Sequence, residues 1–188
     1  IIQSNSFYSD PHKLLGKCDF VMANPPFNVD KVDKKKDYIK KDPRLPFGLP
    51  TNDNANYLWI QYFHSYLNKT GKAGFVMAAS AGDAGNSEKL IRKKLISTHD
   101  VEAIVSIGNN FFYTKSLPCH IWFFNKKKMA SSKDKILMID ARKIFTRVTQ
   151  TINEFSTDQL EALTTIMKSF RGLKVDFSKN KLLIEKLK

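Results

Sequence analysis

An α/β fold is predicted for this chain of 188 residues, with a sheet that is parallel in its first part. Short apolar segments alternate with segments of helical periodicity, as in parallel strands that are joined by helices. The last apolar segments follow one another without a helical crossover, so at least one strand is expected to run antiparallel. The predicted strands span residues 19–23, 73–78, 101–107, 119–124 and 136–139, and the predicted helices between them span 56–68 and 87–97.

Three segments in the first part of the chain have a distinct character. The first strand, Asp19-Phe20-Val21-Met22-Ala23, is expected to be buried. Residues 28–53 are polar, basic and rich in Pro and Gly, which predicts a long loop of the kind that is often functional. In the helix at 56–68, Leu58, Tyr62 and Tyr66 recur at four-residue spacing, and this predicts an amphipathic helix.

The character of the chain changes after Asp140, which predicts two parts, residues 1–140 and a helical extension at 141–188. Ser156 and Gln159 have the spacing of a capping box at the start of a helix. Gly172 is expected to end that helix, and the basic tail at 179–188 to form a short one. The apolar stripe of the first helix consists of Leu160, Leu163, Met167 and Phe170.

The composition is that of a globular protein, with 42% hydrophobic and 26% charged residues. No apolar run approaches the roughly 20 residues that span a bilayer. No signal peptide is expected, because residues 1–4 are not a basic stretch followed by an apolar one. Two cysteines outside any paired motif favour a reduced, cytoplasmic protein. The four histidines show no ligand spacing, so no metal site is expected. The net charge of +13 favours a polyanionic partner over a merely solvated basic surface.

The strongest candidate site is Asn24-Pro25-Pro26-Phe27, which directly follows the first predicted strand. Ligands of open α/β sheets bind beyond the carboxyl ends of the strands. Two consecutive prolines fix the backbone and remove two N–H donors, so the carbonyl of Pro25 can face a ligand. Asn24 and this carbonyl can accept both hydrogens of one exocyclic amine, and Phe27 can stack on a planar base. The alternative is a rigid turn in which Asn24 is a local cap.

This arrangement matches the requirements of methyl transfer to adenine N6. The N6 lone pair is delocalised into the ring, and two acceptors on its hydrogens favour a more tetrahedral nitrogen that attacks a sulfonium methyl in line. Positioning and electrostatics carry such a step without a strong base. The base must leave the duplex to reach the pocket.

Several segments resemble the methylation subunit of type I restriction-modification systems, a family of N6-adenine DNA methyltransferases. Asn24-Pro25-Pro26-Phe27 after its strand resembles the family's catalytic motif, and Asp42-Pro43-Arg44 and Asn54-Ala55-Asn56-Tyr57 resemble the loop that follows. The other segments that carry the resemblance are 47–50, 71–76, 91–95, 110–113, 117–119 and 139–142, so that it extends over nearly the whole chain.

The resemblance implies a partial Rossmann-like sheet that depends on S-adenosylmethionine. It also implies double-stranded DNA as substrate, with specificity and restriction subunits as partners. Phe112 and Tyr113 become candidates for a second aromatic at the flipped base, with core packing as the alternative. Lys34, Lys35 and Lys36 are candidates for DNA contacts, with a solvated loop as the alternative.

The chain departs from the family pattern where the cofactor should bind. It has no acidic-G-x-G turn, so the cofactor-binding residues are expected upstream of Ile1, and Asn5 stands where the family has an acid. The fragment is therefore expected to be inactive alone. Two alternatives stay open: methylation of RNA adenine or protein glutamine by the same motif, and a non-catalytic assembly module that contacts partner subunits.

Overall fold

The computed structural model describes residues 2–50 and 54–187. One five-stranded sheet has the order β1-β2-β4-β3-β5. β1 pairs in parallel with β2 and β3 with β5, whereas β4 runs antiparallel between β2 and β3, which confirms the predicted mixed sheet. The strands are β1 (Cys18–Ala23), β2 (Leu67–Ala78), β3 (Val101–Ile107), β4 (Cys119–Asn125) and β5 (Leu137–Asp140).

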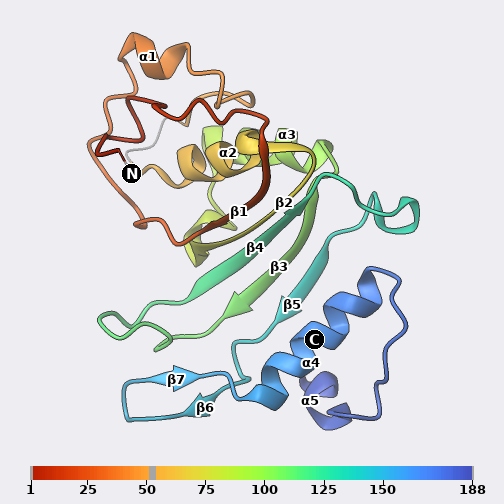
Figure 1. Cartoon of the computed structure of the whole chain (residues 1–188). Helices are drawn as coiled ribbons and strands as arrows, with labels where there is room; N and C mark the ends of the chain where they lie inside the picture. The colour runs from red at the N-terminus through yellow and green to blue at the C-terminus, as the bar shows by residue number, and fades with distance from the viewer. Residues whose placement is uncertain (1, 51–53, 188) are drawn as a thin grey trace.

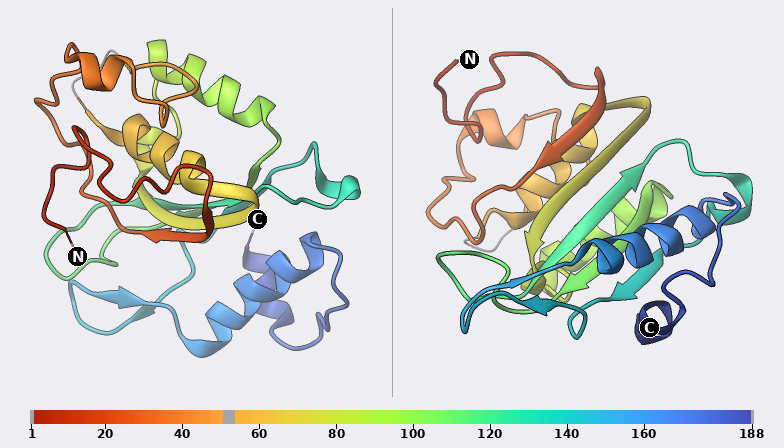
Figure 2. Two further views of the ribbon diagram at one scale, coloured as in Figure 1. Left: turned by 45° about the horizontal axis from the view of Figure 1, so that its top comes forward. Right: turned by 60° about the horizontal axis from the view of Figure 1, so that its bottom comes forward.

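Helices lie on both faces of the sheet (Figures 1 and 2). α2 and α3 cover one face, and α4 covers the β3, β4 and β5 side of the other, where no described helix lies in front of β1 and β2 (Figure 2, right). The helices are α1 (Asp37–Lys40), α2 (Asn56–Tyr66), α3 (Asn86–Ser97), α4 (Thr157–Phe170) and α5 (Lys181–Lys186), with short 3₁₀ turns at Ala79–Ala81 and Ala130–Ser132. None of these helices is long and apolar enough to cross a membrane.

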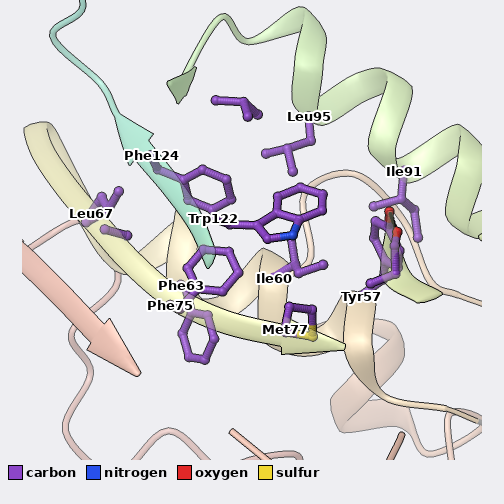
Figure 3. Close-up of a cluster of buried hydrophobic side chains, with 13 residues drawn as sticks. Tyr57, Ile60, Phe63, Leu67, Phe75, Met77, Ile91, Leu95, Trp122 and Phe124 are labelled. Carbon is purple, nitrogen blue, oxygen red and sulfur yellow. Dashed lines mark hydrogen bonds between the residues drawn. The ribbon is translucent and has the colours of Figure 1, made fainter. Parts of the chain in front are cut away.

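The main core lies between the sheet and the helices α2 and α3 (Figure 3). Phe75 of β2 contacts Phe124 of β4 with ring centroids 5.0 Å apart, and Phe63 of α2 approaches Phe75 at the same distance. Trp122 is buried among these rings and below Leu95 of α3 (Figure 3). This core holds the end of β2 firmly beside β1, where the candidate motif begins.

The prediction that α2 is amphipathic is wrong. Residues 56–58 and 60–65 of the helix are all buried. One side of α2 packs on the sheet through Ile60 and Phe63, and the other packs through Leu58 and Tyr62 against residues of the segment at 28–50. The four-residue spacing therefore marks one of two apolar faces, because a second layer of chain covers the side that sequence periodicity assigns to solvent.

A buried ion pair in that second layer attaches it to α2. Arg44 is 1% and Asp42 6% exposed, and the Arg44 Nε lies 3.0 Å from both Asp42 carboxylate oxygens. Arg44 also donates to the Tyr66 hydroxyl of α2 at 2.9 Å and to the Ser6 carbonyl at 3.0 Å. Burial opposes the charge, but these hydrogen bonds raise the pKa of Arg44 above its ordinary value. Residues 51–53 of the predicted loop at 28–53 lie outside the described residues. The described part at 28–50 has a small core of its own and the helix α1.

β1 is less buried than its sequence predicts. Val21 and Ala23 pack against the main core, but Phe20 is 78% and Met22 93% exposed. Alternate side chains of a strand point to opposite faces, and the face of Phe20 and Met22 has no helix over it within the described residues. Within the described residues, β1 is also an edge strand, with β2 as its neighbour in the sheet.

The extension after Asp140 begins with a two-stranded hairpin, β6 (Thr146–Arg147) and β7 (Asn153–Glu154), which sequence periodicity does not predict. The capping box at α4 is confirmed: Ser156 Oγ accepts from the Gln159 N–H at 3.3 Å, and Gln159 Oε1 accepts from the Ser156 N–H at 2.9 Å. The helix ends as expected just before Gly172, which has φ +73°. The expected short helix in the tail is α5.

Candidate active site at the end of β1

Asn24 is the first residue after β1, at the carboxyl end of the strand. The parallel pairing of β1 and β2 places this end beside the carboxyl half of β2, with Ala23 opposite Phe75. Pro25 is buried, whereas Asn24 and Pro26 are exposed. The motif therefore has a fixed backbone and an asparagine that solvent and ligands can reach.

A cavity of about 410 Å³ opens beside the motif. All four motif residues line it, together with residues of the segment between β3 and β4. The lining residues are Asn24, Pro25, Pro26, Phe27, Phe112, Thr114, Lys115 and Leu117. The cavity thus joins two parts of the chain that lie more than eighty residues apart in the sequence.

Phe27 and Phe112 both line this cavity and contact each other at its wall. Their ring centroids are 5.9 Å apart and their planes meet at 82°, an edge-to-face contact. A base between two parallel ring faces would need centroids about 7 Å apart, twice the usual contact distance of about 3.5 Å. A planar ligand in this geometry can therefore lie on the face of one ring with its edge toward the other.

The turn after the motif is held by a reciprocal pair of asparagines. The Asn56 Oδ1 accepts from the Asn28 backbone N–H at 3.0 Å, and the Asn56 Nδ2 donates to the Asn28 Oδ1 at 2.8 Å. Asn56 is only 2% exposed, and Asn28 has φ +50°, a conformation that Asn tolerates better than most residues. These bonds fix Phe27 relative to the first turn of α2.

The structure separates the two aromatic candidates and the three lysines. Phe112 lines the cavity, whereas Tyr113 is 81% exposed and outside it. Lys34 donates to the Asn54 carbonyl at 3.1 Å, and Lys36 Nζ lies 4.4 Å from the centre of the Tyr8 ring. Lys35 is exposed. None of the three lysines lines the cavity beside Asn24.

Two further polar residues line the cavity and were missed by the sequence reasoning, Thr114 and Lys115. Both are exposed, so they lie at the mouth of the cavity, where Lys115 adds a positive charge. Their signal in the sequence is only their position just after Phe112, within the segment that connects two strands. Phe27, which lines the same cavity as Thr114 and Lys115, is remote from them in the sequence.

Near Asn24, the described residues offer few polar groups for a nucleoside cofactor. A second hollow, of about 490 Å³, adjoins Asn24 and runs over the uncovered face of the sheet. Its lining is almost wholly apolar and includes Met22, Gly74, Val76 and Phe123. Asn5 uses its amide oxygen locally, as acceptor for the Phe7 N–H at 3.0 Å. The described residues therefore fit a base beside Asn24 but provide no carboxylate for a ribose in this hollow.

Other parts of the described chain offer less chemistry. Among these residues, no three His, Cys, Asp or Glu side chains gather as a metal site would require. A separate cavity of about 460 Å³ lies below α3, with Ile104, Trp122 and His120 in its lining, and it shares no residue with the cavity at Asn24. Burial lowers the pKa of His120 below its ordinary value.

The sequence model of the N-6 DNA Methylase family matches residues 1–186. The chain belongs to this family. Its curated relatives include the type I restriction enzyme MjaIX methylase subunit of Methanocaldococcus jannaschii, which is 36% identical over 91% of this chain. The HindI methylase subunit of Haemophilus influenzae is 31% identical over 87% of the chain. The chain spans only 31% and 36% of the lengths of these relatives.

Solved structures show that the fold is that of this class of proteins. A type I restriction-modification methyltransferase subunit from Streptococcus thermophilus superposes with a TM-score of 0.78 at 22% identity, over 89% of this chain and 35% of that one. A putative class I S-adenosylmethionine-dependent methyltransferase from Listeria monocytogenes superposes with a TM-score of 0.53 at 13% identity, over 81% of this chain and 42% of that one. The predicted methyltransferase-type sheet is therefore confirmed for this member of the N-6 DNA Methylase family.

Proposed function

We propose that this chain forms the base-binding half of an adenine-N6 DNA methyltransferase, as part of a type I methylase subunit. The observation that carries the proposal is the cavity in which the Asn24-Pro25-Pro26-Phe27 motif faces Phe112. The motif stands at the carboxyl end of a parallel strand, where α/β sheets bind their ligands. Membership of the family supports methyl transfer to adenine N6 as the reaction. The cavity supports the end of β1 as the place where the base binds.

The residues of the chain would act on the base by positioning and by hydrogen bonding. Asn24 is exposed at the cavity and can accept one hydrogen of the N6 amine through its amide oxygen, while the Pro25 carbonyl accepts the other. Two acceptors localise the nitrogen lone pair and orient it toward the methyl donor. Phe27 holds the base plane by stacking, and Phe112 meets the base edge. No side chain has to remove a proton before transfer: the N6–methyl bond would form as the sulfonium–methyl bond breaks, the donor would leave as a neutral thioether, and the methylated nitrogen would then lose one proton to solvent.

The cofactor in this proposal is S-adenosylmethionine, which supplies an electrophilic methyl group when bound. The proposal places its binding groups in the remainder of the subunit, because this chain has no G-x-G turn and spans about a third of its relatives. The hollow that adjoins Asn24 would then be closed by those residues. The isolated chain is accordingly proposed to be inactive.

DNA and the other subunits are proposed as partners. Lys115 at the mouth of the cavity is the basic residue best placed to meet the phosphate of an extruded nucleotide. Lys34, Lys35 and Lys36 are proposed to contact DNA further from the base, in the segment that follows the motif. Sequence recognition is assigned to a separate specificity subunit, and the restriction subunit joins the same complex.

An assay of the methylated product tests this proposal. The complete subunit with its specificity partner is incubated with labelled S-adenosylmethionine and, in parallel, with duplex DNA, RNA or the proteins of the same host. The expected product is N6-methyldeoxyadenosine from DNA alone. Label in RNA adenine or in a protein amide would establish the corresponding rival reaction. The absence of transfer to all three substrates would favour an assembly module.

A further inference from the structure

The segment that carries Phe112 is held by the C-terminal extension. Residues 108–118 leave β3 and return as β4, and residues 113–116 are exposed. Two hydrogen bonds connect this segment to β7: the Asn153 backbone N–H donates to the Asn110 carbonyl at 2.7 Å, and the Asn153 Nδ2 donates to the Asn109 carbonyl at 3.1 Å. Among the described residues, no other hydrogen bonds are made to residues 109–118.

Two packing contacts reinforce the same attachment. The ring of Phe111 lies 4.7 Å from that of Phe155, which follows β7. At the start of the segment, a Cβ on Gly108 would lie 2.7 Å from the Arg142 carbonyl oxygen, so that only glycine allows this close approach. The extension thus touches the segment at Gly108, at Asn109 and Asn110, and at Phe111, immediately before Phe112.

The chemistry of Asn153 suits this task. The residue is 6% exposed, and its side-chain and backbone N–H groups donate to two consecutive carbonyls of the segment, those of Asn109 and Asn110. Asn110 has φ +68°, a left-handed conformation that Asn adopts more readily than most residues but less readily than glycine. Hydrogen bonds on both sides of that turn stabilise it and set the direction in which the chain continues to Phe112.

We propose that Asn153 and Phe155 are positioning residues for the base cavity, which makes the C-terminal extension a working part of the site. They hold the segment at 108–118 so that Phe112 meets Phe27 and closes one side of the cavity. The inference rests on the proposed function, because it assigns these residues to the same base-binding step.

The test uses the complete subunit with its specificity partner and a fluorescent adenine analogue at the methylated position, which reports base extrusion. Asn153→Asp keeps the size of the side chain but places a carboxylate oxygen against the Asn109 carbonyl. It should raise the KM for DNA about tenfold, the loss expected for one buried hydrogen bond, and should lower the extrusion signal, with the KM for S-adenosylmethionine unchanged. Phe155→Leu should act in the same direction, and Phe155→Tyr should retain the wild-type signal.

Met167→Ala is the matched control for simple destabilisation. Met167 is a buried residue of α4, is 9% exposed and belongs to the same extension, but it does not line the base cavity. This variant should melt at a lower temperature and keep wild-type DNA KM and extrusion at temperatures well below melting.

The outcomes separate the inference from the proposed function. Asn153→Asp values equal to those of Met167→Ala, in a wild-type background that extrudes and methylates the adenine, would overturn the inference alone. A wild-type subunit that extrudes no base would overturn both.

Discussion

At the residue scale, the candidate site depends on contacts around two side chains, Asn24 and Phe27. Phe27 is fixed on one side by the edge-to-face contact with Phe112, and on the other by the asparagine pair that holds Asn28 to α2. Asn24 remains exposed at the cavity. A rigid aromatic next to an accessible amide is suited to hold a planar base while its amine is hydrogen bonded.

The stacking role of Phe27 predicts a graded series of variants. Phe27→Ala should weaken capture of the extruded adenine by roughly 1–3 kcal/mol, the usual worth of stacking a base on an aromatic face. Phe27→Tyr and Phe27→Trp should retain most of the capture. Fluorescence of an adenine analogue at the target position measures it in the complete enzyme. Equal signals from the Ala and Trp variants would remove Phe27 from the site.

The sequence predicted the motif and its place after a strand, but it could not choose between Phe112 and Tyr113. The two are neighbours with similar apolar character, and the choice depends on which ring points toward Phe27. That direction is set by contacts of the segment with β7, about forty residues further along the chain. Lys115 was missed for the same reason.

At the element scale, α4 is attached to the sheet by a partly buried ion pair. The Arg171 Nε after the end of α4 donates to the Glu102 Oε1 of β3 at 3.0 Å, and the Asn125 Nδ2 of β4 donates to the same oxygen at 2.8 Å. Burial raises the pKa of Glu102, but the hydrogen bonds from Arg171 and Asn125 outweigh it and hold the pKa below the ordinary 4.5.

Arg171→Met should therefore destabilise the protein in a pH-dependent way. A lowered carboxyl pKa contributes stability above pH 4.5, and this is lost as the pH falls through the folded-state value. At pH 7 the variant should lose about 1–2 kcal/mol of unfolding free energy, since Arg171 is partly exposed and solvent screens the pair. Denaturant unfolding of the complete subunit at several pH values measures the difference, which should shrink below pH 4.5. A difference that is constant with pH would exclude the ion pair as its cause.

An element could be predicted from the sequence where residues close together in the chain encode it. The capping box and the strand at 101–107 were found because each is encoded by adjacent residues. The hairpin of β6 and β7 has two residues per strand, too few to show a period. The burial of α2 and the exposure of β1 were predicted wrongly because both depend on which layer of chain covers the second face.

At the scale of the whole molecule, the chain has a sheet that is open on one side. Phe20 and Met22 project from the edge strand β1, and the apolar hollow beside Asn24 continues over the same face. An exposed apolar face next to an unpaired strand edge favours association with further chain. The relatives are about three times as long as the matched region, so they contain further residues outside it.

The isolated chain of 188 residues should bind S-adenosylmethionine weakly or not at all, and should self-associate through β1. The reason is that the described residues offer an apolar hollow without a carboxylate for the ribose. Isothermal titration measures the first expectation, and sedimentation measures the second with Met22→Lys as the variant that should reduce association. A micromolar dissociation constant for the cofactor would show that its site lies within these residues.

Substitution of Asn24 in the complete enzyme tests the central assignment most directly. Asn24→Ala should lower the methyl-transfer rate on the order of a hundredfold or more, as is usual for loss of a hydrogen-bonding group that acts in the transition state. The dissociation constant for S-adenosylmethionine should stay unchanged, because Asn24 is assigned to the base. A variant that keeps more than half of the wild-type rate would contradict the assignment of this cavity as the site of methyl transfer.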